Sequence, residues 1–242
     1  MKLKDKVAIV TGSGRGIGRE IALLFAREGA KLTVTARSGG QVDEVVKQIV
    51  KKGGQALGVR VDVSRQVEVQ QMVAKTMENF GRVDILVNNA GVAHVMPFIV
   101  FEPELWREVI EVNLMGPFYC TKAVVPIMLD QGWGRIINIS SRSGKIGYAF
   151  ETAYGASKHG LVGFTKALAE ELAPFKITVN AICPGATATD MIPQEVRDRV
   201  KGPIINPSDI AELALYLTGE SAKSINGEAI NVFGDNKLDL SV

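Results

Sequence analysis

The sequence has 242 residues, of which 46% are hydrophobic, enough to bury the core of one α/β domain. Its 28 basic and 26 acidic residues leave a net charge of +2, so we expect no attraction to nucleic acid or to a membrane surface. No 18-residue apolar block and no signal-peptide cleavage pattern occurs, which favours a soluble cytoplasmic protein.

Seven short runs rich in β-branched residues have the length of buried strands. Helical periodicity lies between most of them, and Gly29 and Gly53 stand where two helices should end. This alternation predicts a doubly wound, seven-stranded parallel Rossmann-type sheet with helices on both faces, in one domain over residues 1–242. The expected strands are Val7–Thr11, Leu32–Thr35, Ala56–Val61, Ile85–Val87, Ile136–Ile139, Ile177–Ala181 and Ala229–Val232.

The one irregular stretch is Ala186–Asn206, which contains Pro193 and Pro203 and is expected to form a lid over a substrate pocket. Asn206-Pro207 then offers an N-cap and a first-turn proline for the next helix.

A glycine-rich turn follows the first predicted strand and opens a helix. Its spacing is Gly12-x-x-x-Gly16-x-Gly18, which lets the backbone approach a pyrophosphate at the positive end of that helix. The pattern differs from G-x-G-x-x-G, and no Gly-Lys-Ser/Thr supports a nucleoside-triphosphatase loop. A tight structural turn is the alternative, but the strand–turn–helix context favours a diphosphate cofactor.

The end of the second predicted strand distinguishes the two nicotinamide cofactors. Proteins that bind NAD usually carry an acidic residue here for the ribose 2′-hydroxyl, whereas this sequence has Ala36-Arg37. A guanidinium can pair with a 2′-phosphate, so Arg37, helped by Arg15, favours NADPH. Both arginines, and Arg15 especially, could instead be ordinary surface charges.

Tyr154 and Lys158 lie four residues apart at the start of an apolar helical run, so they share one helical face. A neighbouring ammonium should lower the pKa of the phenol towards neutral pH and make Tyr154 a general acid. Taken alone, this spacing is equally typical of a surface pair.

Together the motifs resemble the short-chain dehydrogenase/reductase family from about Lys6 to Gly234. The resemblance rests on the glycine turn and on Asp62, Asn88-Asn89-Ala90-Gly91, Asn113, Ser140-Ser141, Tyr154-x-x-x-Lys158 and Pro184-Gly185. It is closest to 3-oxoacyl-[acyl-carrier-protein] reductases and related carbonyl reductases.

The resemblance implies a cofactor site built by loops after several strands. Asp62 would hold the adenine, Asn89 to Gly91 would flank the cofactor, and Lys158 would bind the nicotinamide ribose. Thr187 and Thr189 would meet the carboxamide. The full implied set is Gly12, Ser13, Arg15, Gly16, Ile17, Gly18, Arg37, Asp62, Val63, Asn89, Ala90, Gly91, Tyr154, Lys158, Pro184, Gly185, Thr187 and Thr189.

Family spacing selects Ser141, thirteen residues before Tyr154, as the catalytic serine and leaves Ser140 structural. Its hydroxyl would stabilise charge that develops on the substrate oxygen. Asn113 lies in an apolar helix, where a packing role is common. The resemblance instead makes Asn113 the holder of a water chain that reprotonates Tyr154 through Lys158.

No metal site is expected, because His94 and His159, the two histidines, lack the spacing of a ligand pair. Cys120 and Cys183 sit in apolar runs and are expected to be buried thiols. His159 should lie on a helix surface, and His94 could line the substrate mouth.

The expected substrate is a small carbonyl compound or acyl thioester, with an acyl carrier protein as a possible partner. Carrier reductases have docking arginines where this sequence has Gly132 and Phe175, which weakens the carrier assignment. Arg142, Lys145 and Lys176 could substitute, but surface charge explains them equally well. The alternatives are a dehydrogenase of a small alcohol, ketone or sugar, and a non-catalytic NADPH-binding regulator.

The resemblance also implies a homotetramer, with a dimer as the alternative. The segments Leu105–Met128 and Ala153–Leu172 carry apolar residues on more than one helical face, which is typical of helices that bury a second surface.

Overall fold

The computed structural model describes residues 1–189, 200–202, 204–233 and 237–238. Seven parallel strands form one sheet in the order β3-β2-β1-β4-β5-β6-β8. They are β1 (Val7–Thr11), β2 (Lys31–Ala36), β3 (Gln55–Arg60), β4 (Ile85–Asn88), β5 (Gly134–Ile139), β6 (Ile177–Pro184) and β8 (Ala229–Val232). The predicted sheet is confirmed, with several strands one to three residues longer than expected.

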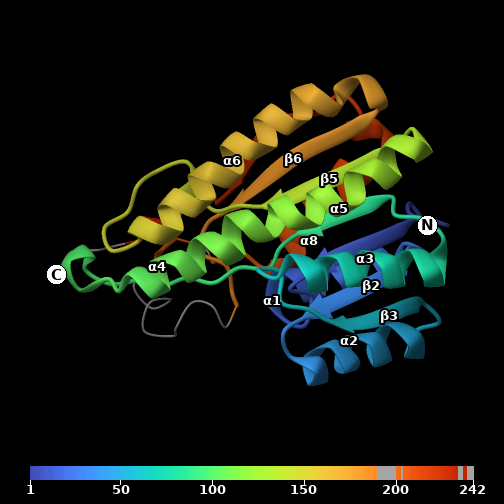
Figure 1. The fold of residues 1–242 in the computed structure, drawn as a ribbon, viewed down its shortest axis with the longest axis horizontal. Coiled ribbons are helices and arrows are strands. Elements are labelled where there is room, and N and C mark those ends of the chain that lie inside the picture. Colours follow the sequence, from blue (N-terminus) through green and yellow to red (C-terminus); the bar gives the residue numbers. More distant parts are fainter. Residues whose placement is uncertain (190–199, 203, 234–236, 239–242) are drawn as a thin grey trace.

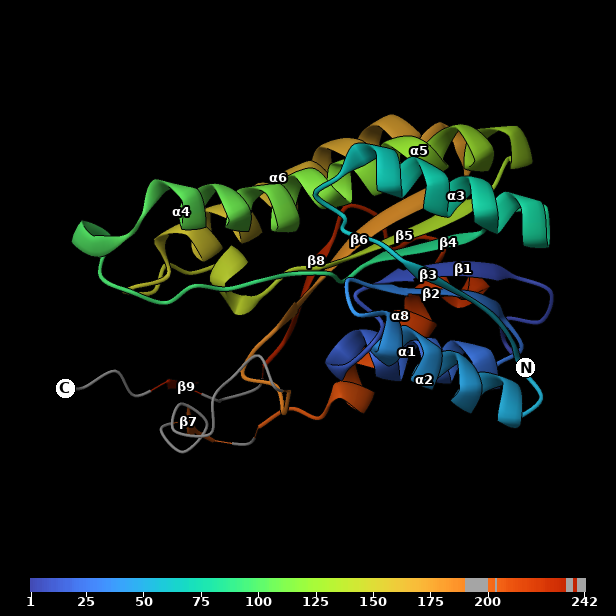
Figure 2. The same cartoon turned by 60° about the horizontal axis from the view of Figure 1, so that its bottom comes forward.

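Helices cover both faces of this sheet (Figures 1 and 2). In Figure 2, α3, α4, α5 and α6 lie above it, and α1, α2 and α8 lie below it. The bounds are α1 (Gly16–Arg27), α2 (Gly39–Lys51), α3 (Gln66–Phe80), α4 (Pro103–Ile110), α5 (Gly116–Gln131), α6 (Thr152–Leu172) and α8 (Pro207–Thr218). Shorter turns are η1 (Phe98–Val100), η2 (Glu111–Met115), η3 (Arg142–Gly144), η4 (Ala173–Phe175) and η5 (Glu220–Ala222).

The two predicted stop glycines have left-handed backbone angles. Gly29 has φ +92° after α1, and Gly53 has φ +82° after α2. Glycine adopts this conformation without steric cost, which is why it commonly follows the last turn of a helix. The start of α8 is also as expected: Pro207 lies in its first turn, and the N–H of Asn206 donates to Asp209 Oδ2 at 3.3 Å.

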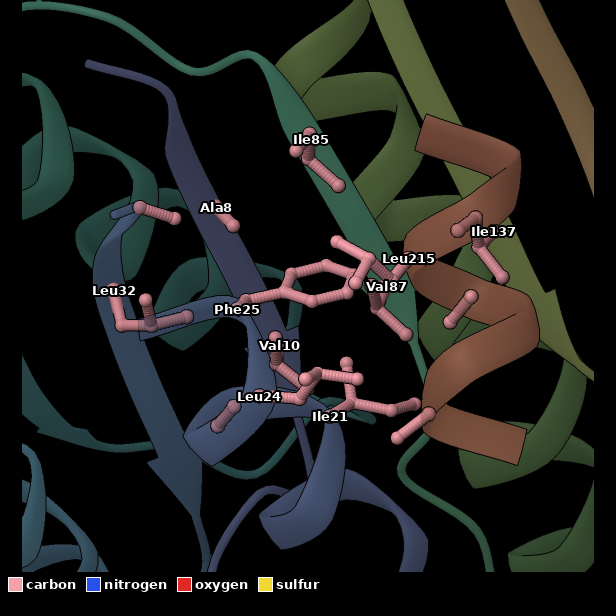
Figure 3. Close-up of a cluster of buried hydrophobic side chains, with 14 of the residues drawn as sticks. Ala8, Val10, Ile21, Leu24, Phe25, Leu32, Ile85, Val87, Ile137 and Leu215 are labelled. Carbon is pink, nitrogen blue, oxygen red and sulfur yellow. The ribbon is translucent and has the colours of Figure 1, made fainter. Parts of the chain in front are cut away.

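Two hydrophobic clusters bind the helices to the two faces of the sheet. In the cluster of Figure 3, the side chains of Ile21, Leu24 and Phe25 from α1 meet Val10 of β1 and Leu215 of α8. The other cluster joins the strands to α3 and α5 through Met72, Val124 and Met128, among others. Strands packed from both sides explain why their sequences read as nearly continuous apolar runs.

The continuous stretch Pro103–Gln131 is long and apolar enough to cross a membrane by length and composition alone. Core helices of soluble proteins pass the same test, and 44% of its most apolar window is buried inside the protein. Val112, Cys120, Val124 and Met128 of this stretch pack in the second cluster. We therefore interpret it as a core helix.

The expected lid, 186–206, falls in large part on residues 190–199 and 203, which lie outside the described residues. Part of the remainder is more regular than expected, because β7 (Val200–Lys201) pairs antiparallel with β9 (Lys237–Leu238). This backbone pairing joins residues far apart in the sequence, and two-residue strands have no periodicity from which to predict them. An isolated bridge also joins Thr187 to Ile205.

Candidate active site

The strand order reverses between β1 and β4, and ligands of open α/β sheets bind outside the carboxyl ends of the strands at such a point. Because all seven strands are parallel, the predicted residues that follow β1, β2, β3, β4, β5 and β6 reach the same edge of the sheet. The topology therefore gathers the segments that the sequence singled out.

The glycine turn is locked to β4 by Asn89. The Asn89 Nδ2 group donates to the carbonyl oxygens of Thr11 at 2.9 Å and Gly12 at 3.0 Å. The Thr11 hydroxyl oxygen accepts the N–H groups of Asn89 at 2.9 Å and Ala90 at 3.1 Å. Asn89 thus holds the glycine turn against the end of β4, in addition to any contact with a cofactor.

Two positions of the turn require glycine, for different reasons. Gly12 has φ +63°. A Cβ at Gly18 would lie 2.6 Å from the carbonyl oxygen of Gly12 and would overlap Asn89 Nδ2. The turn can therefore keep its close packing on α1 only with glycine at position 18, and the positive end of α1 follows directly after the turn.

Two other members of the predicted set have structural contacts of their own. Ser13 is fully buried, and its hydroxyl donates to the Val10 carbonyl at 2.7 Å and accepts the Thr35 N–H at 2.9 Å. Ile17 packs against the first core cluster. Contacts of this kind depend on which atoms the fold brings together, so spacing alone does not predict them.

The loop after β6 reaches the glycine turn at Thr189. Gly185 N–H donates to the Val232 carbonyl at 3.0 Å, and the buried Thr187 donates to the Gly185 carbonyl at 3.0 Å. A Cβ added at Gly16 would lie 3.2 Å from Thr189 Cγ2. The structure thus places Thr189 beside the loop expected to hold the pyrophosphate, whereas Gly185 contacts β8 and Thr187 contacts Gly185.

A polar pocket of about 420 Å³ lies at the ends of β2 and β3. It brings together two predicted residues, Arg37 and Asp62, and adds three that we did not predict. All five lining residues are charged: Arg37, Arg60, Asp62, Arg65 and Glu68. A charged side chain at the carboxyl end of a predicted strand was the available signal for Arg60. Val63 is buried beside Gly116.

The pocket arginines are held by specific contacts. Arg60 Nε donates to the Arg37 carbonyl at 3.1 Å, which fixes the two residues next to each other. Arg37 Nη1 lies 3.7 Å from a carboxylate oxygen of Glu108 on α4, and Glu108 also contacts His94 at 2.9 Å. Arg37 is thus within reach of both the pocket and α4. Arg15 is exposed, and it is the extended residue directly before α1.

Ser141, Tyr154 and Lys158 come together where η3 packs on α6. The Ser141 hydroxyl hydrogen-bonds the phenol of Tyr154. The Lys158 ammonium is buried, donates to the Ile139 carbonyl at 2.9 Å and lies 5.6 Å from the centre of the Tyr154 ring. Ser140, by contrast, donates to the Lys158 carbonyl at 3.1 Å, in keeping with its expected structural role.

The expectation that Lys158 lowers the pKa of Tyr154 is wrong for this structure. Burial raises the pKa of Tyr154 to about 12, the Ser141 hydrogen bond opposes that rise, and the charge of Glu151 adds to it. Burial also lowers the pKa of Lys158 to about 8. Spacing in the sequence shows that two groups are close, but it does not show how far each is removed from water.

Asn113 lies in η2, a turn of π-helix between α4 and α5, and π-helical turns often occur at functional sites. Its buried amide accepts the Val92 N–H at 2.9 Å and donates to the Val92 carbonyl at 2.9 Å and to Ser157 Oγ at 3.1 Å. A Cβ added at Gly91 would lie 3.3 Å from Asn113 Oδ1 and 3.7 Å from Lys158 Nζ. Asn113 and the Lys158 ammonium therefore both lie beside Gly91, and Asn113 braces the connection after β4.

The remaining residues that the sequence singled out have other surroundings, except that Cys183 lies close to Ser140, Ser141 and Lys158. His159 is exposed on α6, as expected, and Cys120 and Cys183 are buried free thiols. Gly132 ends α5, and Phe175 is 48% exposed. Within the described part of the chain, no group of three or more His, Cys, Asp or Glu residues is placed to hold a metal ion.

Comparison with known proteins gives a consistent result. A family model described as short chain dehydrogenase matches residues 6–200. A 3-oxoacyl-[acyl-carrier-protein] reductase of Synechocystis is 41% identical over 243 residues, which cover 96% of this chain and 97% of that protein. A D-beta-hydroxybutyrate dehydrogenase of Cupriavidus necator is 36% identical, covering 96% and 98%.

Among solved structures, a variant of actinorhodin polyketide ketoreductase determined with NADPH is similar over most of its length. Its TM-score is 0.90 at 41% sequence identity, and the match covers 95% of this chain and 96% of that one.

Proposed function

The chain belongs to the short-chain dehydrogenase family and is an NAD(P)-dependent oxidoreductase, and from that premise we propose that it reduces a carbonyl group with NADPH through Ser141, Tyr154 and Lys158. The observation that carries the proposal is the hydrogen bond between Ser141 and Tyr154 beside the buried Lys158 ammonium. A hydroxyl pair that binds and protonates an oxygen needs this arrangement.

The residues present fit a dinucleotide cofactor. The glycine turn leads into the N-terminus of α1, whose positive end favours a diphosphate, and the polar pocket lined by Arg37 and Asp62 is of a size to take an adenosine end. When bound, NADPH supplies a hydride. In this proposal Asn89 fixes the turn, Lys158 holds the nicotinamide ribose, and Thr187 and Thr189 hold the carboxamide.

Proton transfer is the part of the reaction that falls to the protein. Since burial raises the pKa of Tyr154 to about 12, the phenol keeps its proton at neutral pH, as the acid of a reduction must. Ser141 donates a hydrogen bond to the carbonyl oxygen as negative charge develops there. Asn113 completes the group by holding the chain of water molecules that reprotonates Tyr154 through Lys158.

The preference for NADPH is predicted to reside in Arg37, assisted by Arg60. We expect Ala36→Asp combined with Arg37→Ile to reverse the preference, because it removes a guanidinium and adds a carboxylate that repels the 2′-phosphate. The measurement is kcat/KM with NADPH and with NADH. If the variant keeps the wild-type ratio, the assignment is wrong.

The substrate is proposed to be a 3-oxoacyl thioester or a similar small carbonyl compound. The similarity to a 3-oxoacyl-[acyl-carrier-protein] reductase supports this class, and the similarity to a hydroxybutyrate dehydrogenase supports a small hydroxy or oxo compound as the second candidate. Gly132 and the exposed Phe175 give a carrier protein no guanidinium at those positions. We propose the cytoplasm as the site of action.

The experiment that tests this function is the decay of NADPH absorbance with acetoacetyl thioesters, diketones and simple ketones. We expect decay with at least one of them. Tight NADPH binding without decay for any of them would overturn the proposed reduction and favour a regulator that senses the cofactor.

Assembly as a homotetramer, or else as a dimer, is expected because apolar side chains stay exposed next to the core helices. Phe118 on α5 is 37% exposed, and Phe98 and Ile99 of η1 are 71% and 92% exposed. Light scattering at micromolar concentration should therefore give a mass above the 26.0 kDa of one chain. A monomer alone would contradict this expectation.

A further inference from the structure

A closed set of contacts joins the loop that carries Ser141 to the first turn of α6. Ser141 Oγ accepts the Ser143 N–H at 3.1 Å, and the Ser143 hydroxyl donates to Glu151 Oε2 at 2.6 Å. Glu151 is the N-cap residue of α6, three residues before Tyr154, and its carbonyl accepts the Gly155 N–H at 2.7 Å. The Ser141–Tyr154 hydrogen bond closes the ring.

This loop has little freedom to adopt another arrangement. Ser143 is 5% exposed, and a Cβ added at the buried Gly144 would lie 2.7 Å from the Lys158 carbonyl oxygen. Phe150 has φ +68°, a strained conformation for a bulky residue, and its carbonyl accepts the Met96 N–H at 3.0 Å. The backbone is thus held in a costly shape directly before Glu151, which implies that surrounding contacts enforce it.

Several charged and titratable groups lie on the segments that pack around the start of α6. Tyr148, Tyr154 and Lys158 lie on its own segment, and Arg142 and Lys145 lie on the η3 side. His94 and Glu108 belong to the elements that follow β4, which the Met96–Phe150 bond joins to this loop. Of the acidic groups among them, Glu151 is the one whose charge raises the pKa of Tyr154.

We propose that Glu151 is a positioning residue for the Ser141–Tyr154 pair, which through Ser143 holds η3 against the first turn of α6. It touches neither substrate nor cofactor in this proposal. Its carboxylate oxygen fixes Ser143, and the Ser143 N–H occupies an acceptor site of Ser141. The one hydroxyl hydrogen of Ser141 is thereby directed to Tyr154, or to the substrate oxygen once substrate is bound. The inference rests on the proposed function of that pair.

Three variants separate the hydrogen bond from the charge. Glu151→Gln keeps an acceptor for Ser143 and removes the charge. Ser143→Ala keeps the charge and removes the bond, and Glu151→Ala removes both. Glu170→Gln, an exposed acid on the same helix, is the matched control.

Turnover should follow the hydrogen bond. We expect kcat to fall about tenfold or more in Ser143→Ala and Glu151→Ala, because a small displacement of a reacting group is costly, with KM for NADPH unchanged. Glu151→Gln and the control should keep kcat near the wild-type value at neutral pH.

The ionisation of Tyr154 should follow the charge. The readout is the tyrosinate difference absorbance over an alkaline titration, with Tyr154→Phe subtracted to remove the other tyrosines. The Tyr154 transition should move to lower pH in Glu151→Gln and Glu151→Ala, because the carboxylate that raises the phenol pKa is gone. It should stay in place in Ser143→Ala and in the control.

Thermal unfolding and NADPH binding are recorded for every variant. If the alanine variants do not fold, the Tyr154 titration of Glu151→Gln is the test. The proposal is overturned if kcat is unchanged in both alanine variants, or if Glu151→Gln leaves the Tyr154 transition at its wild-type pH. The titration needs no substrate. A wild-type protein that reduces no carbonyl compound would therefore contradict the proposed function, and the titration would still show whether Glu151 acts on Tyr154.

Discussion

Tyr154→Phe is expected to lower kcat for carbonyl reduction by about 10²- to 10⁴-fold, the usual contribution of general acid catalysis. The substitution removes one hydroxyl and keeps the ring that packs beside Lys158. NADPH binding should therefore remain close to that of the wild type. The loss should appear in kcat, because the proton is needed only as charge develops on the substrate oxygen.

Tyr148 provides the matched control for this result. It is also partly buried on the segment before α6, but its ring faces Arg142, 5.9 Å away, and Thr152 stands four residues on. Tyr148→Phe should keep most of the wild-type kcat. An inactive Tyr148→Phe together with a fully active Tyr154→Phe would refute the catalytic assignment and the mechanism built on it.

Lys158→Ala should lower both turnover and NADPH affinity, unlike Tyr154→Phe. The ammonium is buried and charge-assisted hydrogen bonds contribute about 1.5–3 kcal/mol, so loss of the ribose contact should weaken NADPH binding by about ten- to a hundredfold. Turnover should fall as well, since the group that returns a proton to Tyr154 is gone. Isothermal titration with NADPH, followed by steady-state kinetics, separates the two effects.

The pH dependence gives a second check on Lys158. Burial lowers its pKa to about 8, so the lysine loses its charge as pH rises through that value. NADPH affinity should accordingly decline above about pH 8 in the wild type. That decline should be absent from Lys158→Ala, and an identical decline in both proteins would assign it to another group.

Much of the fold follows from local patterns. A strand such as β6, buried at all eight positions, has to be apolar along most of its length, and that composition can be recognised in the sequence alone. Gly29 and Gly53 end helices because of a backbone angle that other residues rarely adopt. The grouping of Ser141, Tyr154 and Lys158 was predictable for a different reason. Several motifs occur in a fixed order and spacing, and together they resemble one family.

The features that sequence reasoning missed depend on contacts between distant segments. Asn88 donates to Thr121 at 3.2 Å and to Asn138 at 2.9 Å, and Asn138 donates to Thr165 at 2.8 Å, forming a buried polar chain between strands and helices. No spacing rule relates these positions. The raised pKa of Tyr154 was missed for the same reason, because burial is a property of the folded protein.

Glu151 illustrates a signal that was present but not used. An acidic residue at the start of a helix is favourable because it faces the positive end of the helix dipole, and here it also lies three residues before Tyr154. Its contact with Ser143 spans eight residues and a strained turn at Phe150, so the partner could be identified only from the structure.

The central claim is that hydride passes from NADPH to a carbonyl carbon while Tyr154 protonates the oxygen. The most direct test uses NADPH labelled with deuterium at both C4 positions of the nicotinamide, with mass spectrometry of the product of any compound that consumes NADPH. We predict one deuterium on the carbinol carbon of the product and a large loss of that labelled product with Tyr154→Phe. A product without deuterium, or undiminished labelling with Tyr154→Phe, would contradict the account.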